Sequence, residues 1–168
     1  MERIQVFTIT KATLTDYRTI VTLKYQLYLT MAEVLPAIHK KPDNESLFFP
    51  LSTFEGDLSS TRQVYFIATE KSTETNVAFL SIGKRSSLNS PVFRDASFAN
   101  IDEVYVVPEY RKRGAATDLV NAAFEWAKEN DLQTVKTGVY VSNSEGYHFW
   151  EKMGFTAYKS LIEVNIAR

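Results

Sequence analysis

The stretch Ile101-Asp-Glu-Val-Tyr-Val-Val-Pro-Glu-Tyr-Arg-Lys-Arg-Gly-Ala-Ala116 decides how this chain is expected to fold. Its first part is rich in β-branched residues and ends at Pro108, which predicts a strand over 101–107. From Thr117 to Glu129, apolar residues recur at helical spacing and predict an amphipathic helix. The expected order is therefore a strand, a short basic loop and a helix.

This order is typical of a phosphate site. The first N–H groups of a helix have no internal partner, and the helix dipole favours an anion beside them. The residues from Gly114 to Ala116 are small, which lets a ligand approach the backbone, while Arg111, Lys112 and Arg113 add positive charge. The loop therefore predicts a pyrophosphate site, although the sequence has neither a P-loop pattern nor a Rossmann glycine fingerprint.

These residues resemble the GNAT superfamily of acetyl-CoA-dependent N-acetyltransferases. The family's pyrophosphate motif, Arg/Gln-x-x-Gly-x-Gly/Ala, is matched by Arg111, Gly114 and Ala116, after a Val-x-Pro-x-x-Arg lead-in that begins at Val106. A second stretch, Asn143 and then Phe149-Trp-Glu-Lys-Met-Gly-Phe155, resembles the family's Asn-x-x-Ala-x-x-Leu/Phe-Tyr-Glu-Lys-x-Gly-Phe. The resemblance is close over 101–158 and elsewhere holds only as the order of elements.

The resemblance implies acetyl-CoA as co-substrate and no metal. It places the pantetheine arm between the strand that ends at Val107 and a strand over Val135–Val141, a gap that suits a β-bulge. The arm would pair with exposed strand backbone and with the side chain of Asn143. The residues expected to bind the cofactor are Tyr105, Val106, Arg111, Arg113, Gly114, Ala115, Ala116, Thr117, Asn143 and Trp150.

The implied reaction is direct attack of a primary amine on the acetyl thioester. A lysine-like ammonium has a pKa near 10.4, so about one molecule in a thousand is neutral at pH 7, and a base is needed. Glu103, on the strand before the acetyl site, is the candidate base through a water; a solvated or salt-bridged strand carboxylate is the alternative. A backbone N–H near Val106 would stabilise the oxyanion.

The second motif departs from the family at two positions. Trp150 stands where the family usually has its general-acid Tyr, and Gly146 stands where Ala is common. The acid role therefore does not transfer to Trp150, which is expected to line the CoA channel. Tyr147, one helical turn earlier, is the candidate substitute, with a packing role as its alternative; the thiolate could also leave without an acid.

The acceptor is expected to be a small-molecule amine. Aromatic residues that could line its pocket, and acidic residues that could attract a cation, are Tyr25, Tyr28, Phe48, Phe49, Phe54, Asp43, Glu45, Glu55 and Asp57. Core packing and a solvated acidic loop explain the same residues. A protein or peptide N-acetyltransferase and a catalytically weak acyl-CoA-binding sensor remain open alternatives, and so does a homodimer.

Composition limits the other classes of function. The chain has 168 residues, which fits a single domain over 1–168, and its net charge of −1 offers no basic field for nucleic acid. It has no cysteine, which excludes disulfides, cysteine zinc sites and a cysteine nucleophile. No apolar run is long enough for a membrane helix and no signal peptide is visible, so a cytoplasmic protein is expected.

The remaining elements complete an α/β (α+β) fold, a GNAT-like mixed and mostly antiparallel sheet with helices on both faces. The expected elements are a strand over Arg3–Ile9, a helix from about Tyr17 to Pro36 capped by Thr13, Thr15 or Asp16, a loop with a short helix over Ala37–Thr61, a hairpin of Val64–Thr69 and Val77–Ile82, a loop over Gly83–Ser97, a helix over Ser144–Lys152 capped by Gly154, and one or two strands over Phe155–Ile166.

Overall fold

A computed structural model describes residues 5–35, 40, 44–86, 97–162 and 164. The chain divides into two compact units, 1–137 and 138–168, and each is described by itself. The elements of the first unit are β1 (Phe7–Lys11), α1 (Tyr17–Val34), α2 (Glu45–Phe48), α3 (Leu51–Ser59), β2 (Gln63–Glu70), β3 (Thr75–Ser86), β4 (Ser97–Val106), α4 (Ala115–Glu129) and β5 (Val135–Thr137), with short 3₁₀ turns η1 (Leu14–Asp16) and η2 (Pro108–Tyr110). The second unit contains α5 (Ser144–Lys152).

The described strands form one sheet in the order β1-β2-β3-β4-β5. The first four strands are antiparallel, while β5 lies parallel to β4 and pairs only over Ala99–Ile101 with Val135–Thr137. A parallel neighbour needs a crossover connection, and α4 supplies it. The mixed, mostly antiparallel sheet is the one that the sequence predicts.

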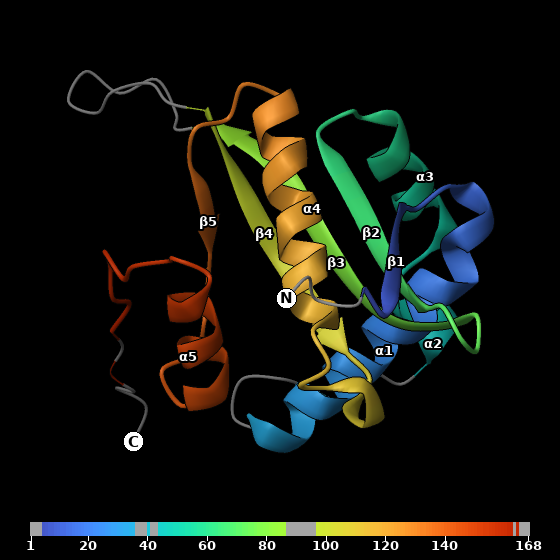
Figure 1. The fold of residues 1–168 in the computed structure, drawn as a ribbon, viewed down its shortest axis with the longest axis horizontal. Helices are drawn as coiled ribbons and strands as arrows, with labels where there is room; N and C mark the ends of the chain where they lie inside the picture. Colours follow the sequence, from blue (N-terminus) through green and yellow to red (C-terminus); the bar gives the residue numbers. More distant parts are fainter. Residues whose placement is uncertain (1–4, 36–39, 41–43, 87–96, 163, 165–168) are drawn as a thin grey trace. The chain divides into compact units, whose positions relative to one another are not determined.

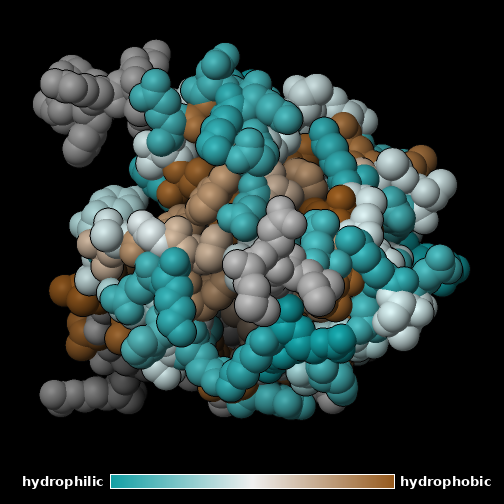
Figure 2. All heavy atoms as spheres, viewed as in Figure 1, coloured by the Kyte–Doolittle hydropathy of each residue, from teal (hydrophilic) through white to brown (hydrophobic). Residues whose placement is uncertain are grey.

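The sheet carries helices on both faces, as expected. Helix α4 crosses β2, β3 and β4 on the near face in Figure 1, and α1, α2 and α3 lie behind the sheet. The stripe Leu119, Val120 and Ala123 of α4 is fully buried. Burying a Val or Leu side chain contributes about 1.5–3 kcal/mol, so this face explains why the helix forms. Hydrophilic groups gather over its C-terminal end, where Glu125 and Lys128 pair at 2.7 Å (Figure 2).

The opposite face holds an aromatic core. Helices α1 and α3 and the segment between them pack onto β2, β3 and β4 through buried apolar side chains, namely Ile20, Leu23, Phe49, Phe54, Tyr65, Ile67, Phe79 and Tyr105. The rings of Phe54 and Tyr65 lie 5.3 Å apart, and the hydroxyl of Tyr17 donates to the carbonyl of Phe49 at 2.8 Å. This core fixes where the first helix meets the sheet.

Several predicted boundaries hold in the structure. The hairpin is β2 and β3, and the helices over 117–129 and 144–152 are α4, which starts two residues earlier, and α5, whose bounds match. Thr13 is the N-cap of η1 in a capping box, in which the Asp16 carboxylate accepts the N–H of Thr13 at 2.8 Å, and Asp16 is the N-cap residue of α1. Gly154, at φ +89°, follows the end of α5, and the N–H of Phe155 reaches the carbonyl of Trp150 at 3.0 Å, a Schellman-type end.

Other expectations are corrected. The opening strand is Phe7–Lys11, and the described residues between α1 and the hairpin form α2 and α3. Strand β3 extends into the expected loop as far as Ser86, and β4 begins within it at Ser97. Pro36 and residues 87–96 lie outside the described residues. Strand β5 stops at Thr137, before Gly138.

The predicted C-terminal strand is also wrong over 155–162 and 164, where no strand forms. Strand propensity reflects packing on a half-buried pleated surface. Leu161 and Ile162 are more than 90% exposed, so the apolar pattern there has no such surface to pack on. Residues 163 and 165–168 lie outside the described part of the chain.

Candidate functional site

The connection from β4 to α4 forms a compact turn around a helix N-terminus. In the 3₁₀ turn η2, the N–H of Tyr110 donates to the carbonyl of Val107 at 2.9 Å. Two residues of the loop that follows have positive φ, namely Lys112 at 60° and Gly114 at 98°. Left-handed backbone of this kind carries little cost only at glycine, which explains the residue at position 114. The first bond of α4 joins the N–H of Asp118 to the carbonyl of Gly114 at 3.0 Å. The N–H groups of Ala115, Ala116 and Thr117 therefore precede the helical ladder, where an anion can accept them.

The side chains of Arg111 and Arg113 hold this turn against the sheet. Arg111 Nε donates to the carbonyl of Val106 at 3.1 Å, and its guanidinium lies 5.9 Å from the ring of Tyr105. Arg113 pairs with the carboxylate of Glu70, at the end of β2. Both arginines, expected to contact the cofactor, thus make contacts that shape the loop.

Glu70 anchors the loop through a buried carboxylate. Its oxygens accept the hydroxyl of Thr73 at 2.7 Å and the guanidinium of Arg113. The Thr73 hydrogen bond and then Arg113 lower the pKa of Glu70 from its ordinary value near 4.5, against an opposing effect of burial. Because the charged form is favoured in the folded protein, the carboxylate stabilises the fold above the unfolded pKa, and this contribution is lost as the pH falls through the lower, folded pKa.

We therefore expect the melting temperature to fall on acidification below about pH 4.5, with Glu70 contributing part of the slope. Thermal unfolding followed by circular dichroism from pH 7 to pH 3 measures it. Glu70→Gln should flatten that part of the profile, whereas Glu125→Gln, an exposed carboxylate on α4, should leave its shape unchanged. Superimposable profiles for Glu70→Gln and the wild type would contradict the assignment.

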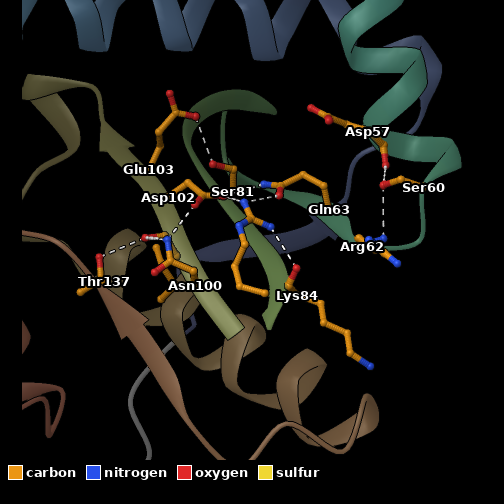
Figure 3. A network of polar contacts seen from close by, with 12 residues as sticks. Asp57, Ser60, Arg62, Gln63, Ser81, Lys84, Asn100, Asp102, Glu103 and Thr137 are labelled. Carbon is orange, nitrogen blue, oxygen red and sulfur yellow. Dashed lines mark hydrogen bonds and ion pairs between the residues drawn. The ribbon is translucent and has the colours of Figure 1, made fainter. Parts of the chain in front are cut away.

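A β-bulge in β4 brings two consecutive carboxylates to one face of the sheet. Ser81 of β3 pairs with Glu103 and Ile82 pairs with Ile101, so Asp102 has no partner in β3. In a regular strand, neighbouring side chains point to opposite faces, and one extra residue breaks this alternation. Asp102 and Glu103 accordingly both line a cavity on the face that α1 and α3 cover (Figure 3).

This cavity has a volume of about 340 Å³. Its aromatic side chains come from α1, from the segment before α3 and from β2. Its polar side chains come from α1, α3 and strands β2, β3 and β4. The lining residues are Lys24, Tyr28, Phe49, Asp57, Gln63, Tyr65, Ser81, Arg85, Asp102 and Glu103. Of the residues expected to form an acceptor pocket, Tyr28, Phe49 and Asp57 line it. Phe54 instead belongs to the buried core, and Phe48 packs against Tyr28 at 4.8 Å. Asp43 lies outside the described residues.

Glu103 lies within a local network in the cavity. Its Oε2 accepts the ammonium of Lys24. The same oxygen accepts the hydroxyl of Ser81 at 3.1 Å (Figure 3), and Ser81 is itself 1% exposed. Lys24 is buried as well, and its Nζ lies 4.5 Å from the centroid of the Phe49 ring. The salt-bridged carboxylate that was the alternative for Glu103 is therefore present, and it sits inside a cavity.

Asp102 is held by a separate set of contacts. Its Oδ2 accepts Arg85 at 2.8 Å and Gln63 at 3.0 Å, and its Oδ1 accepts Asn100 at 2.7 Å (Figure 3). A Cβ at Gly83 would come within about 2.2 Å of the Arg85 and Gln63 side chains, so glycine leaves the space that this network fills.

Tyr65 and Asp57 complete the polar lining. The Tyr65 hydroxyl donates to Asp57, and burial first, then this hydrogen bond and the negative charges of Asp57, Glu103 and Asp102, raise the pKa of Tyr65. The phenol therefore stays neutral at physiological pH. Three carboxylates and two cations line the cavity, so its side chains carry a net negative charge.

Successive residues at the end of β4 direct their backbone groups to different edges of the strand. Val107 donates its N–H to the carbonyl of Val77 at 2.9 Å, and alternate residues of a strand point their backbone groups to opposite edges. Tyr105, which pairs with Phe79, therefore directs its groups to β3, while Val106 directs its own to the other edge. The expectation that Tyr105 offers exposed backbone is corrected, and its ring is buried in the core.

The residues of the second motif lie in the second unit. The Asn143 side chain caps α5, since its Oδ1 accepts the N–H of Gly146 at 2.9 Å. A Cβ at position 146 would lie 2.5 Å from Asn143 Nδ2, so alanine there would require the Asn143 side chain to shift. Trp150 is 7% exposed, and its ring lies 5.0 Å from those of Phe149 and Phe155. Tyr147 is half-exposed. The cofactor and acid roles predicted for these residues stay predictions.

Six residues of the cavity were not expected from the sequence, namely Lys24, Gln63, Tyr65, Ser81, Arg85 and Asp102. Lys24 lies on the helix predicted from about Tyr17 to Pro36, where a single lysine is expected to be exposed to solvent. Its place among the apolar positions Ile20, Val21 and Leu23 was the available signal, since a helix position flanked by core residues can face inward.

Comparisons with known proteins identify the family of this chain. Residues 28–155 match the model of the acetyltransferase (GNAT) family, and the chain belongs to that family. An uncharacterized N-acetyltransferase of Methanocaldococcus jannaschii is 39% identical over 57 residues, and streptothricin acetyltransferase A of Bacillus subtilis is 36% identical over 58 residues. Each match covers 34% of this chain but only 25% and 34% of those two proteins.

A solved structure shares the whole fold. The aminoglycoside N-acetyltransferase AAC(6')-Iy in complex with CoA superposes with a TM-score of 0.73 at 16% sequence identity, over 98% of this chain and 97% of that one. At this identity the likeness shows the fold alone. No helix among the described residues combines the length and the apolar character that a membrane crossing requires.

Proposed function

We propose that this protein transfers the acetyl group of acetyl-CoA to a primary amine of a small, cationic molecule. The observation that carries the proposal is the cavity beside the β4 bulge, in which Glu103 faces aromatic walls and a net negative lining. Aromatic faces and carboxylates are the groups that attract an ammonium. A volume of about 340 Å³ suits a small molecule better than a folded protein surface.

The β4–α4 turn supports CoA as the donor of the acetyl group. A pyrophosphate needs several N–H donors and no bulky side chain in front of them, and the residues from Gly114 to Thr117 supply both. We assign the pyrophosphate to this turn, with the phosphate charge further offset by Arg111 and Arg113, and the pantetheine arm to the backbone edge of Val106. CoA-bound and aminoglycoside-named neighbours of the same fold are consistent with this proposal.

The proposed reaction is a direct transfer. The amine nitrogen, once neutral, forms a C–N bond with the acetyl carbon, the C–S bond breaks, and the thiol of CoA is released with one proton. Glu103 receives the proton of the acceptor's ammonium, directly or through a water, before the attack. A positioned base of this kind contributes about 10²- to 10⁴-fold.

The test is acetyl-CoA-dependent release of free thiol with a panel of polyamines, aminoglycosides, amino acids and lysine peptides. Thiol release with small cationic amines, and formation of the N-acetyl product by mass spectrometry, would support the proposal. Turnover confined to peptides would favour a protein N-acetyltransferase. Acetyl-CoA binding without turnover on any amine would favour a sensor, the alternative that Trp150 at the family's tyrosine position supports.

A further inference from the structure

The cavity contains a fixed cation directly beside the proposed base. Lys24 reaches from α1 to the carboxylate of Glu103 on β4, and its side chain is only 9% exposed. Phe49 packs over the ammonium at 4.5 Å, with Tyr65 and Phe79 at 5.8 and 5.9 Å. A lysine held in this way cannot move to solvent without leaving a carboxylate and an aromatic cage, so its position in the site is fixed.

An acceptor amine that approaches Glu103 meets this cation. Two ammonium groups beside one carboxylate repel each other, and the repulsion disfavours the charged form of the group that can release a proton. The Lys24 ammonium is anchored by the ion pair and by the aromatic rings, whereas the acceptor's ammonium is not. The repulsion therefore lowers the pKa of the acceptor's ammonium.

This deepens the proposed function and rests on it: we propose that Lys24 increases the fraction of bound acceptor amine that is in the neutral, nucleophilic form. The proton leaves the acceptor nitrogen for Glu103 or its water and passes to solvent, and the nitrogen keeps the electron pair that attacks the acetyl carbon. Lys24 neither gains nor loses a proton in this step. It changes the equilibrium that precedes the attack.

The other charged or titratable groups of the cavity belong to every element packed around the pair, namely Tyr28 of α1, Asp57 of α3, Tyr65 of β2, Arg85 of β3 and Asp102 of β4. Asp102 is offset by Arg85, and Tyr65 is neutral. Asp57 favours the ammonium form of an acceptor. Because all of these groups are the same in a wild-type and a Lys24 variant, a comparison of the two isolates the effect of Lys24.

The test is the pH dependence of kcat in Lys24→Gln, with the best amine from the panel. Glutamine removes the charge but keeps an N–H donor for Glu103, so the carboxylate is not left unpartnered. We expect the acid side of the kcat profile to move to higher pH by about one unit, which is about a tenfold loss of kcat at pH 7. The KM for the amine should fall, because Glu103 then attracts the ammonium form without competition.

Three further variants complete the design. Lys24→Met provides a second neutral side chain, so that the test does not depend on how one variant folds, and melting curves with and without CoA check both. Lys24→Arg keeps the charge and should restore the wild-type pH profile. Lys128→Gln, an exposed charge on α4, should change nothing.

The outcomes separate the two proposals. Wild-type turnover with a profile for Lys24→Gln that is lowered in parallel at every pH, or with a raised KM, would overturn the role of Lys24 and leave the proposed function standing. Absence of turnover by the wild type on any amine would overturn the proposed function and this role with it. A shifted profile, a lower KM and rescue by arginine would support both.

Discussion

Replacing Glu103 by glutamine should slow acetyl transfer at pH 7 by about 10²- to 10⁴-fold, the usual contribution of a positioned base. In the wild type, Glu103 Oε2 accepts hydrogen bonds from the ammonium of Lys24 and the hydroxyl of Ser81. Glutamine has the same shape, and its amide oxygen can still accept both. The fold should therefore persist, and the affinity for acetyl-CoA should change little. Steady-state kinetics with the best amine, and calorimetric titration with CoA, measure the two effects.

The size of this deficit should depend on pH. As the pH approaches the pKa of the amine, more acceptor is neutral in solution and the base matters less, so wild type and Glu103→Gln should converge. Glu129→Gln, an exposed carboxylate on α4, is the matched control and should leave kcat unchanged. A loss of less than about threefold at pH 7, or a deficit that stays constant with pH, would rule out Glu103 as the base.

The bulge places a second carboxylate beside the first, and the two can be told apart. Asp102 is held by Arg85, Gln63 and Asn100, so both of its oxygens are engaged. Glu103 uses only Oε2 in its contacts with described residues. This difference favours Glu103 as the proton acceptor, and Asp102→Asn should reduce kcat much less than Glu103→Gln.

Local sequence patterns predicted the parts of the site that local interactions determine. The loop after Pro108, the glycine at position 114 and the two helices α4 and α5 follow from residues within a few positions of each other. The same local patterns predicted a C-terminal strand, which is absent over 155–162 and 164. Strand formation depends on packing against a neighbouring surface, and a local pattern does not show whether that surface is present.

The cavity depended on contacts that are distant in sequence. Lys24 and Glu103 are 79 positions apart, and Gln63 and Asp102 are 39 apart. The bulge contains no glycine or proline that would mark it in the sequence, and a regular strand would place Asp102 and Glu103 on opposite faces. The sequence therefore identified Glu103 through resemblance alone, and its ion pair and its neighbour Asp102 emerged only from the folded chain.

The turn before α4 is the second place where one substitution should have a large effect. Gly114 has φ 98°, where a side chain strains the backbone, and a β-branched residue is worse than alanine. In Gly114→Val, the turn should relax toward negative φ, and this relaxation should rotate the N–H groups of Ala115 and Ala116 away from a bound pyrophosphate. Each hydrogen bond to a charged group contributes about 1.5–3 kcal/mol.

Loss of one such bond weakens binding by about tenfold, and loss of two by about a hundredfold or more, so we expect the Kd for CoA to rise by about 10- to 100-fold. Calorimetric titration with CoA and with pantetheine, which lacks the phosphates, separates the contribution of the phosphates from that of the arm. Only the affinity for CoA should change. Gly56→Ala is the control, since that glycine lies in α3 and a Cβ there meets nothing within 4 Å. If the valine variant is folded and binds CoA as the wild type does, the pyrophosphate does not lie on the α4 N-terminus. The motif that first identified the family would then have a purely structural role in this chain, because Arg113 and Glu70 would hold the turn whether or not a phosphate is bound.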